Sequence, residues 1–271
     1  SRDWSSDGAL PISILMICFL IVGTSAILGL SKGIKRLSLV NIFLVFLLLA
    51  SFLFLGPTGA IFSLSIESVE TLSKNFLKMS TYTGSEFVQN WTVFYWAWWL
   101  ALSPFVGSFV VNISNGKTLR EIIFGTMFIG ALGSMFHFLI IGNYSYIMFS
   151  ENVVNVPQIL ENGNPNLAIL MIIQTLPYEK FFLGIYSFVM LIFLCTTYDS
   201  CAYVLSSSAM KSMKKNPDIL LRLIFSVLLM VLPGLFLFVD GIEFTKNILL
   251  ISSIPILFIF LAMMYVSIKD S

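Results

Sequence analysis

The sequence predicts an all-α protein, a polytopic membrane helical bundle, and three observations carry this prediction. Hydrophobic residues make up 58% of the 271 residues, and charged residues make up 11%. The mean hydropathy of +0.94 excludes a soluble globular domain. Apolar stretches long enough to cross a bilayer recur along the whole chain. We therefore expect residues 1–271 to form a single membrane domain.

Seven of the apolar stretches are expected to span the bilayer as helices. They cover roughly residues 10–30, 39–63, 91–113, 122–149, 181–208, 219–239 and 248–268. After the second stretch, residues 64–79 alternate apolar with charged side chains, which predicts an amphipathic helix on the outer surface. A further apolar stretch at 167–174 lies among prolines, and we expect a short helix docked on the protein there.

Two proline-containing segments are expected to kink or break their spans. Pro57 follows Gly56 in the second span, and Pro104 stands within the third. Proline has no N–H, so it removes one hydrogen bond from the helix. Membrane helices tolerate such breaks where the freed groups face protein or a cavity. At Pro104 an opened helix could offer carbonyls to an ion or a substrate headgroup; the alternative is an ordinary packing kink.

The distribution of basic residues predicts the orientation in the membrane. With the N-terminus outside, ten Lys and Arg residues fall on the inner side and five on the outer side. Because Lys and Arg are enriched on the cytoplasmic side, we expect a multi-pass protein of the cell (plasma or inner) membrane with its C-terminus in the cytoplasm. The first stretch has no basic leader, so it is not expected to be a cleaved signal peptide.

The third span carries the sequence most informative about function, WTVFYWAWWLALSPFVG at 91–107. At about 1.5 Å per residue, Trp96, Trp98 and Trp99 lie roughly 8–12 Å below the outer end of this span. An aromatic belt at headgroup level is one interpretation, and it suits Trp91. The deeper indoles favour a second interpretation, because aromatic faces in a dry cavity hold a cation, best of all a quaternary ammonium.

Helical spacing divides the side chains of this span into two stripes. One stripe contains Thr92, Trp96, Trp99 and Ser103, and the other contains Phe94, Trp98, Leu102, Phe105 and Phe109. One stripe could face a cavity while the other lines a path or packs on neighbouring helices. The spacing alone leaves both assignments open.

Polar side chains in the fifth span form a second candidate site. Phe193, Thr196, Thr197 and Ser200 share one helical face. Two hydroxyls with nearby carbonyls make a neutral oxygen site that suits a hard monovalent cation such as Na⁺. The alternative is that these hydroxyls bond to carbonyls of their own helix or join helices together. Asp199 is an ionisable residue inside a span, hence a functional candidate, with a hydrogen-bonded structural role as the alternative.

The sequence contains none of the motifs that support catalysis or nucleotide binding, and no segment for nucleic-acid binding. The three cysteines show no spacing typical of a disulfide framework or a metal site. We therefore expect no enzyme and no cofactor, with Na⁺ as a coupling ion.

Residues 90–123, NWTVFYWAWWLALSPFVGSFVVNISNGKTLREII, closely resemble the signature of the betaine/choline/carnitine transporter (BCCT) family. Weaker similarity extends through 25–42, 56–62, 196–200 and 251–270. The resemblance implies part of a LeuT-like inverted-repeat transporter fold, with two repeats of five helices. The seven spans would be the last two helices of the first repeat and the whole second repeat. The family's first five helices have no counterpart, so we expect a fragment, a truncated gene product or one half of a split transporter.

The resemblance also assigns residues. Trp98 and Trp99 match tryptophans of the family's aromatic substrate box, and Phe94, Trp96 and Phe105 match aromatic positions near it or along the path. Phe193, Thr196 and Thr197 match the family's sodium-coordinating stretch, Phe193 through its carbonyl. Leu102 departs from the pattern, because several relatives carry a tryptophan there.

Two functions are therefore expected from the sequence. The first is secondary active uptake, coupled to Na⁺, of a quaternary-ammonium or related zwitterionic solute such as betaine, choline or carnitine. The alternative is a transport-incompetent membrane protein that binds a ligand or a partner. The expected partners are the solute and the lipid bilayer, and the resemblance implies a homotrimer.

Overall fold

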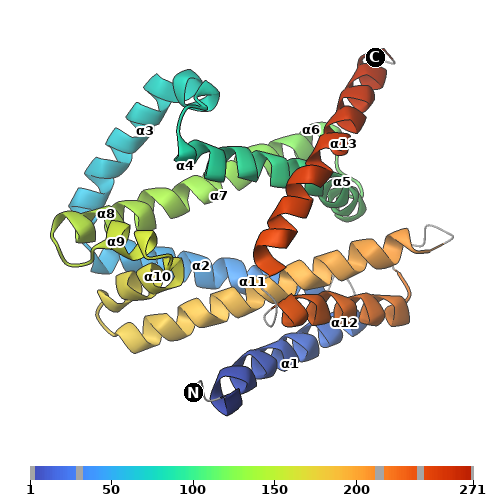
Figure 1. Ribbon diagram of the computed structural model, residues 1–271, viewed down its shortest axis with the longest axis horizontal. Coiled ribbons are helices and arrows are strands. Elements are labelled where there is room, and N and C mark those ends of the chain that lie inside the picture. The colour runs from blue at the N-terminus through green and yellow to red at the C-terminus, as the bar shows by residue number, and fades with distance from the viewer. Residues whose placement is uncertain (1–3, 29–32, 211–216, 237–240, 270–271) are drawn as a thin grey trace. The chain divides into compact units, whose positions relative to one another are not determined.

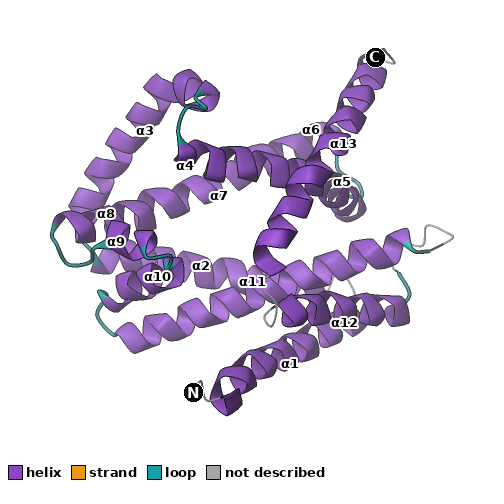
Figure 2. Cartoon of the chain, in the orientation of Figure 1, coloured by secondary structure: helices purple, strands orange, loops and turns teal. Residues whose placement is uncertain are grey.

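The structure is a computed structural model that describes residues 4–28, 33–210, 217–236 and 241–269. All regular secondary structure in these ranges is helical (Figures 1 and 2). The predicted all-α class is therefore confirmed.

The helices follow one another along the chain with short connections. In order, they are α1 (Trp4–Leu28), α2 (Lys35–Leu55), α3 (Thr58–Thr81), α4 (Glu86–Val88), α5 (Phe94–Ile113), α6 (Leu119–Ile123), α7 (Gly130–His137), α8 (Asn143–Ser150), α9 (Val156–Glu161), α10 (Pro165–Gln174), α11 (Glu179–Ser208), α12 (Ile219–Phe236) and α13 (Gly241–Lys269). Wider π-helical turns at Gln89–Val93, Phe124–Ile129 and Phe138–Gly142 join α4 to α5, α6 to α7 and α7 to α8.

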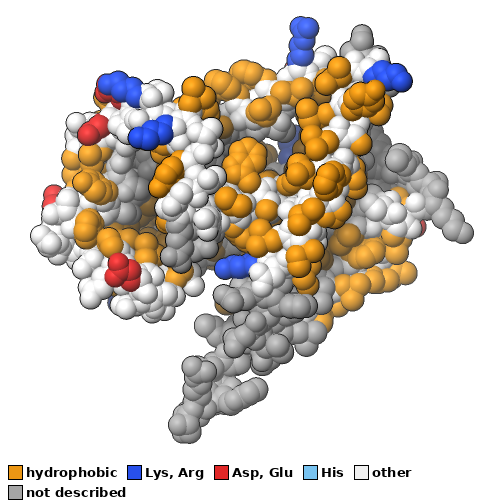
Figure 3. Space-filling view, turned by 45° about the horizontal axis from the view of Figure 1, so that its top comes forward, with side chains coloured by type: hydrophobic (Ala, Val, Ile, Leu, Met, Phe, Trp, Pro, Cys, Tyr) orange, Lys and Arg blue, Asp and Glu red, His pale blue; other side chains and the backbone are white. Residues whose placement is uncertain are grey.

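Five helical stretches among the described residues are long and apolar enough to cross a bilayer. They are Lys35–Leu55, Trp91–Ile113, Leu119–Ser150, Glu179–Ser208 and Lys246–Val266. Two shorter apolar helices, Met16–Ser25 and Ile219–Val231, fall within the first and sixth predicted spans. Hydrophobic side chains are widely exposed on the surface in Figure 3. Helices that face lipid present such a surface, so the chain is a polytopic membrane protein.

The count of seven spans stays a prediction. Residues 29–30 of the first predicted span and residues 237–239 of the sixth lie outside the described ranges. The third predicted span, 91–113, has the same bounds as the observed apolar stretch.

The second predicted span, 39–63, is wrong in extent, because α2 ends at Leu55 and α3 begins at Thr58. Pro57 has no N–H for the carbonyl of Leu53, four residues earlier. The hydroxyl of Thr58 takes over this role and donates to the Leu53 carbonyl at 2.7 Å. The chain therefore breaks at Gly56 and Pro57, where the sequence predicted a kink or a break.

Residues 58–63 belong instead to α3, which also contains the amphipathic segment predicted at 64–79. Ile61 is the only buried residue recorded along this helix. Glu70 and Lys74 form an exposed ion pair one turn apart on its surface. A helix therefore covers the predicted segment, while its amphipathic character and its outer position stay predictions.

The chain divides into two compact units, where the sequence predicted one membrane domain. Unit 1 comprises Ser1–Leu20, Leu77–Gly116 and Ser200–Ser271, and unit 2 comprises Ile21–Phe76 and Lys117–Asp199. Both units combine segments far apart in the sequence. Such packing depends on which helix faces meet, and patterns of neighbouring residues do not reveal it.

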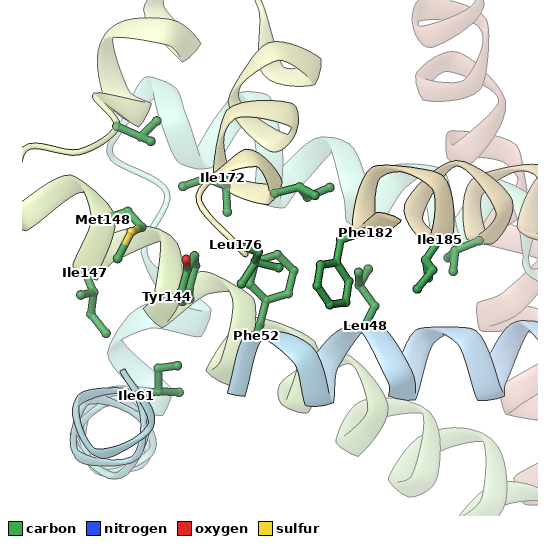
Figure 4. Close-up of a cluster of buried hydrophobic side chains, with 13 residues drawn as sticks. Leu48, Phe52, Ile61, Tyr144, Ile147, Met148, Ile172, Leu176, Phe182 and Ile185 are labelled. Carbon is green, nitrogen blue, oxygen red and sulfur yellow. The ribbon is translucent and has the colours of Figure 1, made fainter. Parts of the chain in front are cut away.

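Unit 2 contains a hydrophobic core built from several helices (Figure 4). Leu48 and Phe52 come from α2, Tyr144 from α8, Ile172 from α10 and Phe182 from α11. The ring of Tyr144 meets Phe52 edge-on, with centroids 5.0 Å apart. The short helix expected at 167–174 is α10, which is docked through buried residues.

Gly56 allows Tyr144 to pack in this core. A Cβ atom at Gly56 would lie 2.7 Å from the Tyr144 ring, which is too close for an undisturbed contact. The Tyr144 hydroxyl forms a hydrogen bond of 2.7 Å with the hydroxyl of Thr175, directly after α10. The interruption between α2 and α3 at Gly56 thus packs against Tyr144, the same side chain that links α8 to the end of α10.

In unit 1, α5 packs against α13. None of the residues of α5 is fully buried, and the helix contains Pro104. The C-terminal part of α5 contacts the C-terminal part of α11 through Phe109 and Tyr203, whose rings meet edge-on with centroids 6.3 Å apart. These contacts place the tryptophan-rich segment in unit 1.

Candidate functional site

Four aromatic side chains on α5 and the π-helical turn before it form one continuous group, which we call the aromatic cluster: Trp91, Phe94, Tyr95 and Trp98. The centroid distances are 6.0 Å for Phe94–Trp98, 5.5 Å for Tyr95–Trp98 and 6.0 Å for Trp91–Tyr95. These values lie within the range of favourable aromatic pairs. The residues of each of these three pairs are three or four positions apart, and this spacing brings side chains together on a helix.

The structure separates the two predicted stripes of α5. Trp96 and Trp99 on the first stripe are 76% and 60% exposed. Phe94, Trp98 and Phe105 on the second stripe are half-buried. Trp98 and Trp99, both matched to the aromatic box, point to different sides because neighbouring residues are about 100° apart on a helix. The aromatic cluster thus includes Phe94 and Trp98, and Trp96, Trp99 and Phe105 lie outside it.

A cation from another helix lies over the aromatic cluster. The Nζ atom of Lys246, on α13, is 5.9 Å from the centroid of the Phe94 ring. This distance is within the range of a cation–π interaction. The Phe94 ring, which the sequence proposed for a substrate cation, therefore already accommodates one.

The sequence analysis placed neither Tyr95 nor Lys246 in this arrangement, and it favoured an aromatic belt for Trp91. Tyr95 is four residues from Trp91 and three from Trp98, so helical spacing could have identified it. Lys246 has no such local signal, because its contact with Phe94 depends on the packing of α13 against α5.

The helix is not opened at Pro104, contrary to one expectation from the sequence. Proline cannot donate to the carbonyl of residue 100. The hydroxyl of Ser103 donates to that Leu100 carbonyl instead, at 2.6 Å. As a result α5 continues as one helix to Ile113, and the Leu100 carbonyl is already satisfied. This arrangement agrees with the packing alternative.

The predicted ion-binding residues of α11 come together in unit 2. The hydroxyls of Thr196 and Thr197 both donate to the carbonyl of Phe193, at 2.9 Å each. Three oxygen atoms thus lie close together on α11, and the sodium site stays a prediction. Because α11 is helical here, the Phe193 carbonyl is also the acceptor for the Thr197 backbone N–H, so the two hydroxyls share it with a backbone donor. The same geometry is also that of hydroxyls bonded to their own helix, the alternative from the sequence.

Asp199 is fully buried and accepts a hydrogen bond from the hydroxyl of Ser25 on α1, which is 3% exposed. Gly33 lies beside this pair. A Cβ atom at Gly33 would overlap the hydroxyl and carbonyl oxygens of Ser25. The structural alternative for Asp199 therefore has a specific partner, which sequence patterns could not identify.

The fold defines a class, a polytopic membrane protein, which here has an aromatic cluster on α5 and adjacent threonine hydroxyls on α11. A family model described as "BCCT, betaine/carnitine/choline family transporter" matches residues 5–271. The chain therefore belongs to the betaine/carnitine/choline transporter family.

Curated relatives agree with this assignment. The chain is 32% identical to "Uncharacterized transporter YeaV" of Escherichia coli (strain K12), over 96% of the chain and 57% of that protein. It is 31% identical to "Carnitine transporter" of Acinetobacter baumannii, over 95% of the chain and 48% of that protein. It is 28% identical to "Ectoine/hydroxyectoine transporter" of Virgibacillus pantothenticus, over 93% of the chain and 50% of that protein. The chain thus spans about half the length of these relatives.

Proposed function

We propose that this chain belongs to a secondary active transporter that takes up a quaternary-ammonium or related zwitterionic solute, coupled to Na⁺. The observation that carries the proposal is the aromatic cluster, in which Phe94 and Trp98 are half-buried and 6.0 Å apart. Membership of a transporter family and relatives named for carnitine and ectoine support the same class of solute.

The solute's cationic headgroup would rest against the ring faces of Phe94 and Trp98. A quaternary ammonium cannot donate a hydrogen bond, so ring faces bind it better than carbonyls do. A desolvated cation–π contact contributes about 2 kcal/mol. We assign Trp96, Trp99 and Phe105 to the rest of the aromatic box and the path, as the family resemblance implies.

Na⁺ would bind between the Phe193 carbonyl and the hydroxyls of Thr196 and Thr197. To do so it must replace the two hydrogen bonds that these hydroxyls donate to Phe193. Each such bond contributes about 1 kcal/mol. The ion would therefore favour a conformation in which the hydroxyls have turned away from the carbonyl, and this differential affinity is what couples an ion to a conformational change.

We further propose a position in the cell membrane with the N-terminus of this segment outside and its C-terminus in the cytoplasm, and a homotrimeric assembly. The asymmetric distribution of Lys and Arg supports the orientation. The trimer rests on family membership alone.

The test is uptake of labelled glycine betaine and carnitine into liposomes that contain the protein expressed from its intact gene. An inward Na⁺ gradient should drive accumulation above that of protein-free liposomes. If accumulation does not depend on the Na⁺ gradient, the proposed Na⁺ coupling is wrong, while the assignment of the solute class still holds. Uptake equal to that of protein-free liposomes for every quaternary-ammonium solute would overturn the proposal.

A further inference from the structure

Lys246 and Phe94 bring a charge of this chain to the proposed substrate position. Lys246 begins the apolar stretch of α13, and its ammonium lies 5.9 Å from the Phe94 ring centroid. Both residues belong to unit 1, in which α13 packs against α5. Phe94 in turn contacts Trp98. The ammonium therefore stands one ring away from an indole proposed to hold the solute.

A positive charge at this place has opposite effects on two kinds of solute. It repels a solute whose net charge is positive, and it attracts a carboxylate. A zwitterion brings both a trimethylammonium group for the rings and a carboxylate for Lys246. A solute without an acidic group brings only the trimethylammonium group, and its positive charge then lies close to that of Lys246.

We propose that Lys246 is a specificity-determining residue, which selects quaternary-ammonium solutes that carry a carboxylate over solutes with a net positive charge. This inference rests on the proposed function and narrows its substrate class.

Lys246 has a partner both in the absence and in the presence of a bound zwitterion. Without solute, the ammonium lies over the Phe94 ring and occupies part of the cation site. When a zwitterion binds, its headgroup takes the ring face, and the exposed, flexible lysine turns to the carboxylate. The Phe94 ring thus contacts a cation in both states, first the Lys246 ammonium and then the solute headgroup. Lys246 exchanges its contact with the ring for a contact with the solute carboxylate. Choline offers no anion, so its binding would leave the ammonium without either partner.

The experiment compares equilibrium binding of glycine betaine and choline, which share the trimethylammonium group, to the purified protein expressed from its intact gene. Lys246→Met removes the charge at similar length, and Lys246→Arg keeps it. Lys269→Met is the matched control, because Lys269 is exposed near the other end of α13. It is roughly 35 Å away at about 1.5 Å per residue.

Lys246→Met should lower the preference for glycine betaine over choline by about tenfold, because both the attraction of the carboxylate and the repulsion of the cation are lost. Lys246→Arg and Lys269→Met should keep the wild-type preference. If Lys246→Met keeps the wild-type preference while the separate variant Trp98→Leu weakens binding of both solutes, Lys246 does not determine specificity. The proposed function would still hold. If the wild-type protein binds neither solute, the proposed function fails, and this inference fails with it.

Discussion

The hydroxyl of Ser25 on α1 donates a hydrogen bond to the carboxylate of Asp199 on α11, and both residues are buried. The two residues are 174 positions apart in the sequence. Asp199 follows Thr196 and Thr197 within one turn of the same helix. The bond thus joins α1 to the part of α11 that carries the proposed ion site.

Removing this donor should destabilise the protein. In Ser25→Ala, the buried Asp199 carboxylate loses the hydrogen bond from α1, and leaving a buried acceptor short of a donor costs about 1–3 kcal/mol. The free energy of unfolding, measured by reversible denaturation in mixed micelles, should fall by this amount.

Ser187→Ala is the matched control on α11. The Ser187 hydroxyl is exposed and donates only to the Leu183 carbonyl of its own helix. Its loss should change the free energy of unfolding by about 0.5 kcal/mol or less. Equal effects of the two substitutions would show that the Ser25–Asp199 bond adds nothing to stability.

Ser103 and Pro104 should behave as a coupled pair. Ser103→Ala leaves the Leu100 carbonyl without the hydroxyl donor, at a cost of about 0.5–1.5 kcal/mol. Pro104→Ala supplies a backbone N–H for the same carbonyl, so Ser103→Ala should cost less in that background. A double-mutant cycle on the free energy of unfolding measures the difference. Additive effects would mean that Ser103 does not replace the hydrogen bond that proline lacks.

The two threonines of the proposed ion site should control the response to Na⁺. Replacing Thr196 and Thr197 with Ala should raise the Na⁺ concentration for half-maximal uptake by about tenfold or more, because a polar group interacting with a charge contributes about 1.5–3 kcal/mol. Proteoliposome uptake at varied Na⁺ measures this change.

Thr126→Ala is the control for this substitution, since Thr126 also bonds to its own helix and is exposed. Its Na⁺ response should match that of the wild type. If the double variant keeps the original Na⁺ response at normal abundance, the hydroxyls of Thr196 and Thr197 only bond to the helix.

Composition predicted the apolar stretch 91–113 with the bounds that the structure gives it, because the Ser103 hydroxyl supplies the hydrogen bond that Pro104 cannot make and the helix continues. It failed at 39–63, because the stretch stays apolar through Gly56 and Pro57. Hydropathy reports the transfer of side chains into lipid, and it does not report the hydrogen bond that Pro57 cannot make. The helix therefore ends where the hydropathy does not change.

The candidate site was predictable only in part, for a similar reason. Contacts along one helix, such as Phe94 with Trp98 or Thr197 with Phe193, follow from a spacing of four residues. Contacts between helices do not. Two contacts depend on how distant segments pack, namely Lys246 with Phe94 and Ser25 with Asp199. No local pattern of residues in the sequence reveals such packing.

The central claim is that Phe94 and Trp98 of the aromatic cluster bind the solute's cationic headgroup, and equilibrium binding of glycine betaine to Trp98→Leu tests it most directly. Loss of a desolvated cation–π contact of about 2 kcal/mol should weaken binding by about tenfold or more. Trp98→Phe should retain part of the affinity because a smaller ring face remains. Trp91→Leu should bind as the wild type does, because the Trp91 ring contacts Tyr95 and not the two rings proposed to hold the headgroup. Unchanged affinity in a folded Trp98→Leu protein would contradict the account.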